Sequence, residues 1–395
     1  MDNSFEMLSR ELDSVAIFRR VLEDPVLVKM RDLIGAPTGD PRKLIRRYSA
    51  FVSELYRHTV NFSEYVLRAV FEDENIFIIQ SARGETIDPY IMEAAENELL
   101  ILQRFSQLSP SDFTDETGIG VELPKWRTCQ IDFLAEYLWR RTNAHRFGYG
   151  KYSRSSMFTL RDGEVVPVEH PDPQRLSELF GYDRQRREVI DNTLALLDGR
   201  PAQNVLLYGD AGTGKSSTVK AVVNEYSDRG LRLIEISKEQ LRELPAVIGE
   251  ISQYPLKFIV FIDDLSFTSG EDSFGALKAA LEGSASSRGE NMAIYATSNR
   301  RHLIRESFSE REGDDIHRND TMQENLSLSA RFGLRVSFGR PDKKEFIAIA
   351  EGIARDKGLE LPEDLGRQAE QFVLSSGNGR SPRTAKQFVE LLLSR

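Results

Sequence analysis

The fold of this chain is decided by the stretch Gly209-Asp210-Ala211-Gly212-Thr213-Gly214-Lys215-Ser216. It has the spacing G-x-x-x-x-G-K-[ST], follows an apolar run at 204–208 and precedes a helical pattern at 216–226. This is the context of a phosphate-binding loop between a strand and a helix. Glycines let such a loop curl so that backbone N–H groups point at a phosphate, and the helix N-terminus adds partial positive charge. We therefore expect a strand–loop–helix unit that binds phosphate groups.

Individual positions of this loop have expected roles in binding a nucleotide. Lys215 can reach the β- and γ-phosphates, and the hydroxyl of Ser216 can ligate Mg²⁺. The other expected nucleotide contacts are Gly209, Asp210, Ala211, Gly212, Thr213, Gly214 and Ser217. A chance glycine-rich turn is the alternative, and the strand and helix patterns on either side argue against it. No Asn-Lys-x-Asp stretch that would specify GTP is present in the sequence.

A second apolar run ends in two acids. The run 258–262 (FIVFI) leads directly into Asp263 and Asp264. Because open α/β sheets place ligands at the carboxyl ends of their strands, both acids are expected near the phosphate loop. We expect Asp263 to hold Mg²⁺ through water and Asp264 to polarise the attacking water. A strand that merely ends in an Asp turn is the alternative, which the phosphate loop upstream makes the weaker interpretation.

The chain from residue 174 onward alternates short apolar runs with helical patterns. The runs lie at 204–208, 231–236, 258–262, 292–296 and 334–338. They are too short and too continuously apolar for surface helices, which favours strands buried on both faces of a parallel sheet. Residues 341–395 are helical again, with Ser381-Pro382 as one helix start. We predict an α/β fold, with a doubly wound parallel sheet in residues 174–340 and a helical lid in 341–395.

The first 173 residues show a different pattern. Residues 5–145 repeat apolar positions at helical spacing, which predicts a mostly α-helical N-terminal domain. Residues 158–168 favour a hairpin around the turn pair Asp162-Gly163. The stiff segment His170-Pro171-Asp172-Pro173 is expected to mark the boundary between this domain and the α/β core.

Two polar positions narrow the class of phosphate-loop protein. Asn299 follows a predicted strand and could position the hydrolytic water between Asp264 and the γ-phosphate; a strand-end asparagine without that role is the alternative. The segment Ser329–Gly333 (SARFG) resembles the Ser-Arg-Phe segment that carries an arginine finger, so Arg331 would reach the γ-phosphate of a neighbouring subunit. Arg335 is the second candidate for the finger. The alternative for Arg331 is an exposed surface arginine without this role.

Two further segments complete the expected site. Ser381 and Pro382 are a good N-cap and first helical residue, so Arg383 would lie in the first turn of the last helix and could reach back to the phosphates. Arg380, just before the cap, is the alternative. Upstream, Leu179–Asp183 (LFGYD) precedes the helix before the phosphate loop and resembles the AAA+ segment whose backbone covers adenine. Gly181 and Tyr182 are therefore the expected contacts to the base. A hydrophobic staple at a helix start is an equally good interpretation of that segment.

These motifs resemble the AAA+ superfamily of P-loop ATPases from about residue 175 to residue 395. The stretches YATSNRRHL (295–303) and SLSARFGLRVSF (327–338) are similar to one bacterial group of ATP-binding AAA proteins of unknown function, whose layout also includes a helical N-terminal half. The pair Asp263-Asp264 resembles the helicase-loader and transposition-helper branch as well. Most AAA+ proteins carry Asp-Glu there. The side chain of Asp264 is about one methylene shorter than that glutamate, so the sequence leaves both fast and slow hydrolysis as alternatives.

The resemblance implies ATP and magnesium as ligands and a homo-oligomer in which the finger acts in trans. Three functions are compatible with this resemblance. The first is an ATPase that couples hydrolysis to a conformational change on an unknown partner. The second is a slowly hydrolysing, nucleotide-responsive scaffold, and the third is a helicase-loader-like role on DNA.

Bulk properties and one basic stretch bear on the partners. The net charge of −10 argues against indiscriminate binding of nucleic acid, and no apolar run is long enough to span a bilayer, so a cytoplasmic protein without a membrane partner is expected. Residues 140–154 (RRTNAHRFGYGKYSR) alternate cations with aromatics, as in single-strand binders. The preferred interpretation of that stretch is a solvated helix end followed by an aromatic-anchored loop that docks on the ATPase module. Residues 306–320 predict a charged, mobile insertion, and Cys129 a small buried hydrophobe.

Overall fold

The structure is a computed structural model that describes residues 2–35, 40–114, 121–266, 272–282, 291–299 and 330–394. The charged insertion expected at 306–320 lies outside these residues. The chain divides into two compact units, Met1–Arg154 and Ser155–Arg395. None of the described helices is long and apolar enough to cross a membrane.

The first unit is helical, as its apolar spacing predicts. Its helices are α1 (Asp2–Ser14), η1 (Arg19–Glu23), α2 (Pro25–Ile34), α3 (Pro41–Leu55), α4 (Phe62–Glu72), α5 (Ile76–Ala82), α6 (Pro89–Ser106), α7 (Ser111–Thr114), α8 (Phe133–Thr142), α9 (Ala144–Phe147) and η2 (Gly150–Ser153). Helix starts coincide with residues whose side-chain oxygens accept backbone N–H groups, as Asp24, Asp40, Asp88 and Asp132 do. Local capping chemistry therefore explains where these helices begin.

Aromatic side chains hold the first unit together. Phe51 packs edge-on against Phe62 and Trp126, with ring centroids 5.1 and 4.9 Å apart. The indole N–H of Trp126 donates to the backbone carbonyl of Leu108 at 2.8 Å. A buried carboxylate, Glu98 on α6, accepts backbone N–H groups from residues 16–18 and so fixes the turn after α1. Burying the acid is tolerable because both of its oxygens are hydrogen-bonded.

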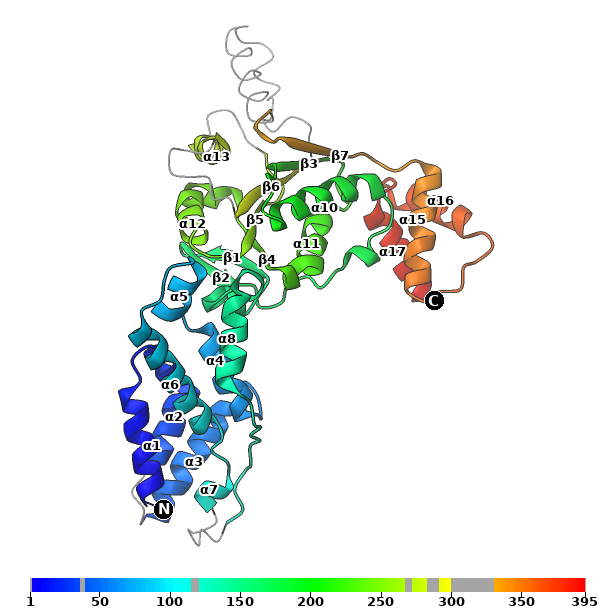
Figure 1. Ribbon diagram of the computed structural model, residues 1–395. Helices are drawn as coiled ribbons and strands as arrows, with labels where there is room; N and C mark the ends of the chain where they lie inside the picture. Colours follow the sequence, from blue (N-terminus) through cyan, green and yellow to red (C-terminus); the bar gives the residue numbers. More distant parts are fainter. Residues whose placement is uncertain are drawn as a thin grey trace. The chain divides into compact units, whose positions relative to one another are not determined.

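The second unit is built on a seven-stranded sheet with the order β2-β1-β4-β5-β6-β3-β7 (Figure 1). The strands are β1 (Met157–Arg161), β2 (Glu164–Pro167), β3 (Val205–Gly209), β4 (Leu231–Glu235), β5 (Lys257–Ile262), β6 (Met292–Ser298) and β7 (Leu334–Phe338). All neighbours pair in parallel except β1 and β2. The α/β class and the five strands predicted from residue 174 onward are confirmed.

The predicted hairpin forms, but it belongs to the α/β unit. Arg161 pairs with Glu164 across the turn, in which Asp162 and Gly163 have φ angles of 52° and 82°. Strand β1 then pairs in parallel with β4 and extends the sheet. The boundary between the compact units therefore follows Arg154 and not residue 173. Periodicity cannot show which sheet a hairpin joins, since that depends on edge pairing with a strand about 75 residues away.

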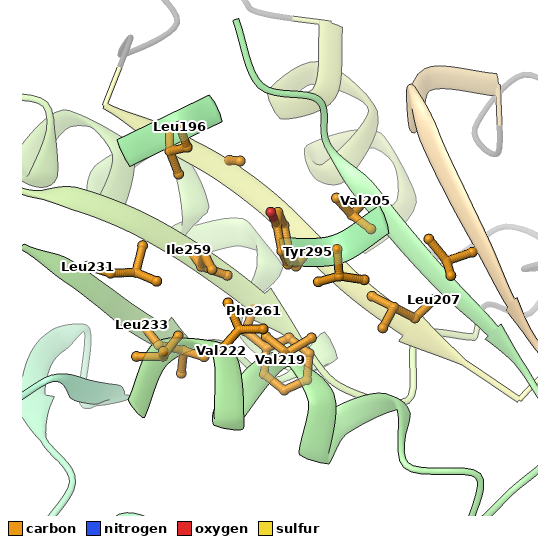
Figure 2. Close-up of a cluster of buried hydrophobic side chains, with 14 of the residues drawn as sticks. Leu196, Val205, Leu207, Val219, Val222, Leu231, Leu233, Ile259, Phe261 and Tyr295 are labelled. Carbon is orange, nitrogen blue, oxygen red and sulfur yellow. The ribbon is translucent and has the colours of Figure 1, made fainter. Parts of the chain in front are cut away.

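One face of the sheet packs on α10 (Asp183–Leu197) and α11 (Lys215–Tyr226). Figure 2 shows Val219 and Val222 of α11 beside Leu233 and Phe261 of the strands. Alternate strand residues point to opposite faces, and both sets are buried, as in the uninterrupted buried pattern of β5. This arrangement explains why the strands read as continuous apolar runs.

The remaining helices of this unit are short, except those that form the lid. They are η3 (Leu176–Glu178), η4 (Ser227–Arg229), η5 (Lys238–Glu243), α12 (Leu244–Ile251) and α13 (Asp272–Glu282). The lid consists of α15 (Lys343–Asp356), α16 (Leu365–Ser376) and α17 (Pro382–Leu393), which follow β7 (Figure 1). It has its own apolar core, in which Phe346, Ala350 and Phe388 are buried. Phe180 and Tyr182, which precede α10, pack against this core as well.

Candidate nucleotide-binding site

The phosphate loop joins the end of β3 to the start of α11. Gly209, Gly212 and Gly214 have φ angles of +137°, +76° and +91°, which L side chains rarely adopt. A Cβ on Gly209 would lie 2.1 Å from the carbonyl oxygen of Phe338, because the loop passes directly against β7. The backbone N–H of Asp210 donates to that same oxygen at 3.1 Å. The motif glycines are thus required by the path of the chain as well as by a phosphate.

The loop presents unused donors. Among the described residues, none accepts a hydrogen bond from the backbone N–H groups of residues 211–216. The ammonium group of Lys215 points back across the loop, where it donates to the carbonyl oxygens of Gly209 and Asp210 at 3.0 and 2.8 Å. It also donates to Oδ1 of Asn299 at 3.0 Å. A cradle of free N–H groups around a lysine fits the phosphates of a nucleotide.

The Lys215 side chain is 6% exposed. This burial lowers the pKa of its ammonium group, and the nearby carboxylates, Asp264 first among them, act in the opposite direction. A bound phosphate would add further negative charge and so favour the protonated lysine. The position is therefore matched to an anionic ligand.

Asp263 lies opposite the first turn of α11. Its Oδ1 accepts hydrogen bonds from the Ser216 hydroxyl at 2.6 Å, from the hydroxyl of Thr297, and from the backbone N–H of Asp264 at 3.1 Å. Within the described part of the chain, no donor contacts its Oδ2. A serine hydroxyl and a carboxylate at hydrogen-bonding distance form a set of hard oxygen ligands, which suits Mg²⁺. The residues therefore fit a magnesium ion.

Asp264 has an unusual backbone conformation. Its φ angle is 51°, in the left-handed region, and its side chain is exposed toward the cavity described below. Oδ1 of Asp264 accepts a hydrogen bond from Nδ2 of Asn299 at 2.7 Å. The two residues that the sequence assigns to the attacking water are thus brought together at the ends of the neighbouring strands β5 and β6.

A cavity of about 770 Å³ connects these groups with the lid. The predicted residues that line it are Ala211, Gly212, Thr213, Gly214, Lys215, Ser216, Ser217, Asp263, Asp264, Asn299 and Arg383. Arg383 comes from the start of α17, where its backbone N–H donates to the carbonyl of Gly212 at 3.2 Å. The lid is therefore tied directly to the phosphate loop.

Arg380, the alternative to Arg383, has a different partner. Its guanidinium forms a two-pronged contact with Glu370 on α16, with Nε and Nη2 at 2.9 and 2.7 Å from the two carboxylate oxygens. It is not among the described residues that line the cavity. The geometry supports Arg383 as the lid arginine that faces a nucleotide.

The residues predicted to cover adenine make contacts outside the cavity lining, and their role toward a base stays a prediction. Gly181 and Tyr182 are not among the described residues that line the cavity. Tyr182 stacks on Phe338 with ring centroids 5.2 Å apart, and its hydroxyl donates to the carbonyl of Gly339 at 2.7 Å. It therefore anchors the segment to the core and lid. The preceding residues Leu179 and Phe180 line the cavity instead.

Phe180 is held by a glycine of the lid. A Cβ on Gly352 of α15 would lie 2.4 Å from Cδ1 of Phe180, so the ring lies directly on the helix backbone. Ile353 of the same helix lines the cavity beside Leu179 and Phe180. Sequence reasoning missed these residues because the contact joins segments about 170 residues apart. An apolar patch of this kind at the end of a phosphate site is suited to a base.

Two further residues were not anticipated. Arg340 follows β7 and contacts Asp210 of the loop through Nε and the backbone N–H, both at 3.2 Å. Thr297, near the end of β6, contacts both acids after β5. Its place within the stretch YATSN, two residues before Asn299, is the signal that could have identified it.

The two finger candidates lie outside the cavity lining. Arg331 is half-buried and precedes Phe332, which is 1% exposed, and β7 begins two residues later. Arg335 is exposed within β7 and pairs with Leu206. Neither is among the described residues that line the cavity. A finger that acts in trans would not line that site, so the assignment of Arg331 stays a prediction.

The basic stretch 140–154 makes contacts within the first unit. Arg140 lies over the rings of Phe71 and Phe147, at 4.3 and 5.1 Å from their centroids. Burial lowers the pKa of Arg140. Arg154 lies 3.7 Å from a carboxylate oxygen of Glu72. Cations that stack on the protein's own rings support the aromatic anchoring of the stretch. Docking of the stretch on the ATPase module stays a prediction. Nucleic-acid binding through it stays a prediction.

A phosphate loop, a strand ending in two acids, a polar residue at the end of the next strand and a helical lid on a parallel sheet define a P-loop protein of the AAA+ superfamily. The chain belongs to the family described as Protein of unknown function (DUF815), whose model matches residues 153–395.

The curated relatives are AAA+ proteins of several kinds. The chain is 30% identical over 204 residues to the ATP-dependent zinc metalloprotease FtsH 3 of Symbiobacterium thermophilum, covering 49% of this chain and 30% of that protein. It is 28% identical over 117 residues to the replication factor C large subunit of Staphylothermus marinus, covering 28% and 27%. The chain thus spans about a third or less of the length of these relatives. A solved mutant of Thermotoga maritima RuvB is similar at 16% identity and a TM-score of 0.40, over 56% of this chain and 65% of that one.

Proposed function

We propose that this protein binds ATP together with Mg²⁺ and hydrolyses the ATP, and that turnover drives a conformational change on a partner. The observation that carries the proposal is the convergence of Lys215, Asp263, Asp264, Asn299 and Arg383 on one cavity. Its lining combines backbone N–H donors and cations with two carboxylates at one end. Phosphoryl transfer to water needs this combination, because catalysis depends on positioning and on stabilising charge.

Each group has a part to play in that reaction. The loop N–H groups and Lys215 bind the phosphates, and Arg383 adds a second positive charge from the lid. Ser216 and Asp263 would hold the magnesium ion, which when bound neutralises phosphate charge. Asp264 accepts a proton from the attacking water, and Asn299 orients that water and the acid together. Leu179, Phe180 and Ile353 hold the base by apolar contact.

The proposal extends to the assembly. Arg331 supplies its guanidinium to the site of a neighbouring copy, and the active form is a homo-oligomer. Support comes from the position of Arg331 just before β7, outside the lining of its own site. An arginine acting in trans stabilises the charge of the transition state, and its removal spares the binding of ATP to each subunit.

A second candidate is a nucleotide-responsive scaffold with slow hydrolysis. One observation favours it. Asp264 is an aspartate whose carboxylate already accepts a 2.7 Å hydrogen bond from Asn299, and its backbone is in the strained left-handed region. An acid engaged in this way polarises water less readily. A motor should hydrolyse ATP faster when its partner is added, whereas the scaffold should keep one slow rate.

Thermal unfolding with and without MgATP tests the site itself. Ligand at about 100 times its dissociation constant should add roughly 2.7 kcal/mol to the folded state. Lys215→Ala should lose most of this gain, since the phosphate contact is removed. Lys220→Ala is the matched control: it lies on the same helix and pairs with Glu235 at 3.0 Å, away from the cavity lining. Equal stabilisation of wild type and Lys215→Ala by MgATP would disprove the phosphate-loop assignment.

A further inference from the structure

Thr297 occupies a central position between the two acids, although it carries no charge itself. It lies near the carboxyl end of β6, is 2% exposed and lines the nucleotide cavity. Strand β6 pairs with β5, whose end delivers Asp263 and Asp264. A buried hydroxyl needs hydrogen-bond partners, so its contacts are informative about what it does.

Both polar groups of Thr297 contact the turn after β5. The hydroxyl donates to Oδ1 of Asp263 and accepts the backbone N–H of Asp264 at 2.9 Å. The carbonyl oxygen accepts the backbone N–H of Leu265 at 2.7 Å. One residue of β6 therefore holds three consecutive residues of the neighbouring strand end.

These contacts account for the backbone conformation of Asp264. A residue other than glycine with a positive φ costs free energy and persists only where its surroundings impose it. The backbone N–H groups of Asp264 and Leu265 lie on either side of the Asp264 side chain. They donate to the hydroxyl and the carbonyl oxygen of Thr297, respectively. The conformation aims the Asp264 carboxylate at Asn299.

The same hydroxyl orients the other acid. Together with the Ser216 hydroxyl and the N–H of Asp264, it places three donors on Oδ1 of Asp263. With Oδ1 engaged in this way, Oδ2 of Asp263 is the oxygen left for a further ligand within the described part of the chain.

We propose that Thr297 is a positioning residue that sets both acids, with its hydroxyl orienting the metal-binding Asp263 and fixing the backbone of Asp264. The inference rests on the proposed ATPase function and adds to it a residue that acts through the two acids. Partners in this outer position commonly change metal affinity or activity by 10- to 100-fold when they are removed.

The test compares Thr297→Val, which has the same shape without the hydroxyl, with Thr297→Ser, which keeps the hydroxyl. In Thr297→Val we expect kcat to fall about 10- to 100-fold and the Mg²⁺ concentration at half-maximal rate to rise about tenfold. Binding of ATP in EDTA should change by less than about threefold, because the phosphate loop is untouched. Thr297→Ser should stay within about threefold of wild type in all three measurements.

Thr193→Val is the matched control for losing a buried hydroxyl. Thr193 is fully buried in the same unit, and its hydroxyl contacts Val189 and Tyr295, away from the cavity lining. In Thr193→Val, the Mg²⁺ concentration at half-maximal rate should equal that of wild type. A structural effect would lower stability in both valine variants without moving the Mg²⁺ midpoint in either.

The outcomes separate the two proposals. Wild-type protein that does not hydrolyse ATP would contradict the proposed function. Wild-type hydrolysis with an unchanged kcat and Mg²⁺ midpoint in Thr297→Val would overturn the role of Thr297 alone. Should Thr297→Val fail to fold, Thr297→Ser still decides the matter: a serine variant with tenfold lower kcat would show that the hydroxyl is not the functional group.

Discussion

The side-chain nitrogen of Asn299 donates a hydrogen bond of 2.7 Å to Oδ1 of Asp264. The amide oxygen of the same Asn299 accepts one from Nζ of Lys215 at 3.0 Å. One asparagine thus links Lys215 to Asp264, the lysine proposed to bind the phosphates and the acid proposed to act on the attacking water. A nucleotide that draws Lys215 toward its phosphates would also change the hydrogen bond from Asn299 to Asp264. The proposed binding and hydrolysis would then be connected at this residue.

The Asp264 carboxylate is expected to be necessary for turnover and unnecessary for binding. Asp264→Asn should keep the left-handed backbone, which asparagine tolerates, and should bind ATP as wild type does. Its kcat should fall about 10²- to 10⁴-fold because the proton acceptor is lost. Asp162→Asn is a matched control, since Asp162 also has a positive φ of 52° but lies in the β1–β2 turn. A wild-type kcat for Asp264→Asn would exclude this acid as the base.

The two lid arginines are expected to behave differently. Arg383→Ala should weaken ATP binding by about tenfold, the typical effect of one charge-assisted hydrogen bond near solvent. Arg380→Ala breaks the contact with Glu370 and leaves the cavity lining intact, so its affinity for ATP should be that of wild type. Isothermal titration with a non-hydrolysable ATP analogue measures both. Weaker binding in Arg380→Ala alone would reverse the assignment.

Arg331 should complete the site of a neighbouring subunit. Arg331→Ala is expected to bind ATP normally and to lose hydrolysis by about 10³-fold or more. Mixing it with Lys215→Ala should restore part of the activity, because a mixed interface can pair an intact phosphate loop with an intact finger.

The rates of the separate variants, measured at the same total concentration, are the control for the mixture. Full activity of Arg331→Ala alone would rule out the finger and leave Arg335 to be tested in the same way. A mixture that stays inactive, while each variant remains folded, would argue against a shared site.

Asp73 in the first unit should make stability depend on pH. Burial raises the pKa of this carboxyl to about 6, and the hydrogen bond from Asn75 opposes the shift. Because the folded-state pKa lies above the ordinary value of 3.8, the stabilising contribution is complete below pH 3.8 and is lost as the pH rises through 6. The loss amounts to at most about 3 kcal/mol.

Asp73→Asn should remove this dependence, so the variant gains stability relative to wild type between pH 4.5 and 7.5. Denaturant unfolding followed by tryptophan fluorescence measures the effect in the relevant unit, since Trp126 and Trp139 both lie there. Asp32→Asn, at an exposed position of α2, is the control. It should change the free energy of unfolding by the same amount at pH 4.5 and at pH 7.5. The prediction would be contradicted if the free energies of unfolding of Asp73→Asn and wild type differed by the same amount at pH 4.5 and at pH 7.5.

The sequence by itself determined the parts of this protein that depend on short spacings. The phosphate loop, the acids Asp263 and Asp264, and the five strands after residue 174 all follow from local patterns, because glycine conformations, strand length and apolar continuity are properties of neighbouring residues. The strand-end positions then place Asp264 and Asn299 together, since adjacent parallel strands end at one edge of a sheet.

Only the tertiary structure decided which residues meet across long separations. It brings Arg383 to the cavity and pairs Arg380 with Glu370, although the two arginines are three residues apart. It puts Phe180 in the cavity wall, because the ring packs on Gly352 of the lid. It joins the hairpin to β4, and it directs Thr297 at the acids. These contacts depend on how separate elements pack, and a local pattern carries no information about its distant partner.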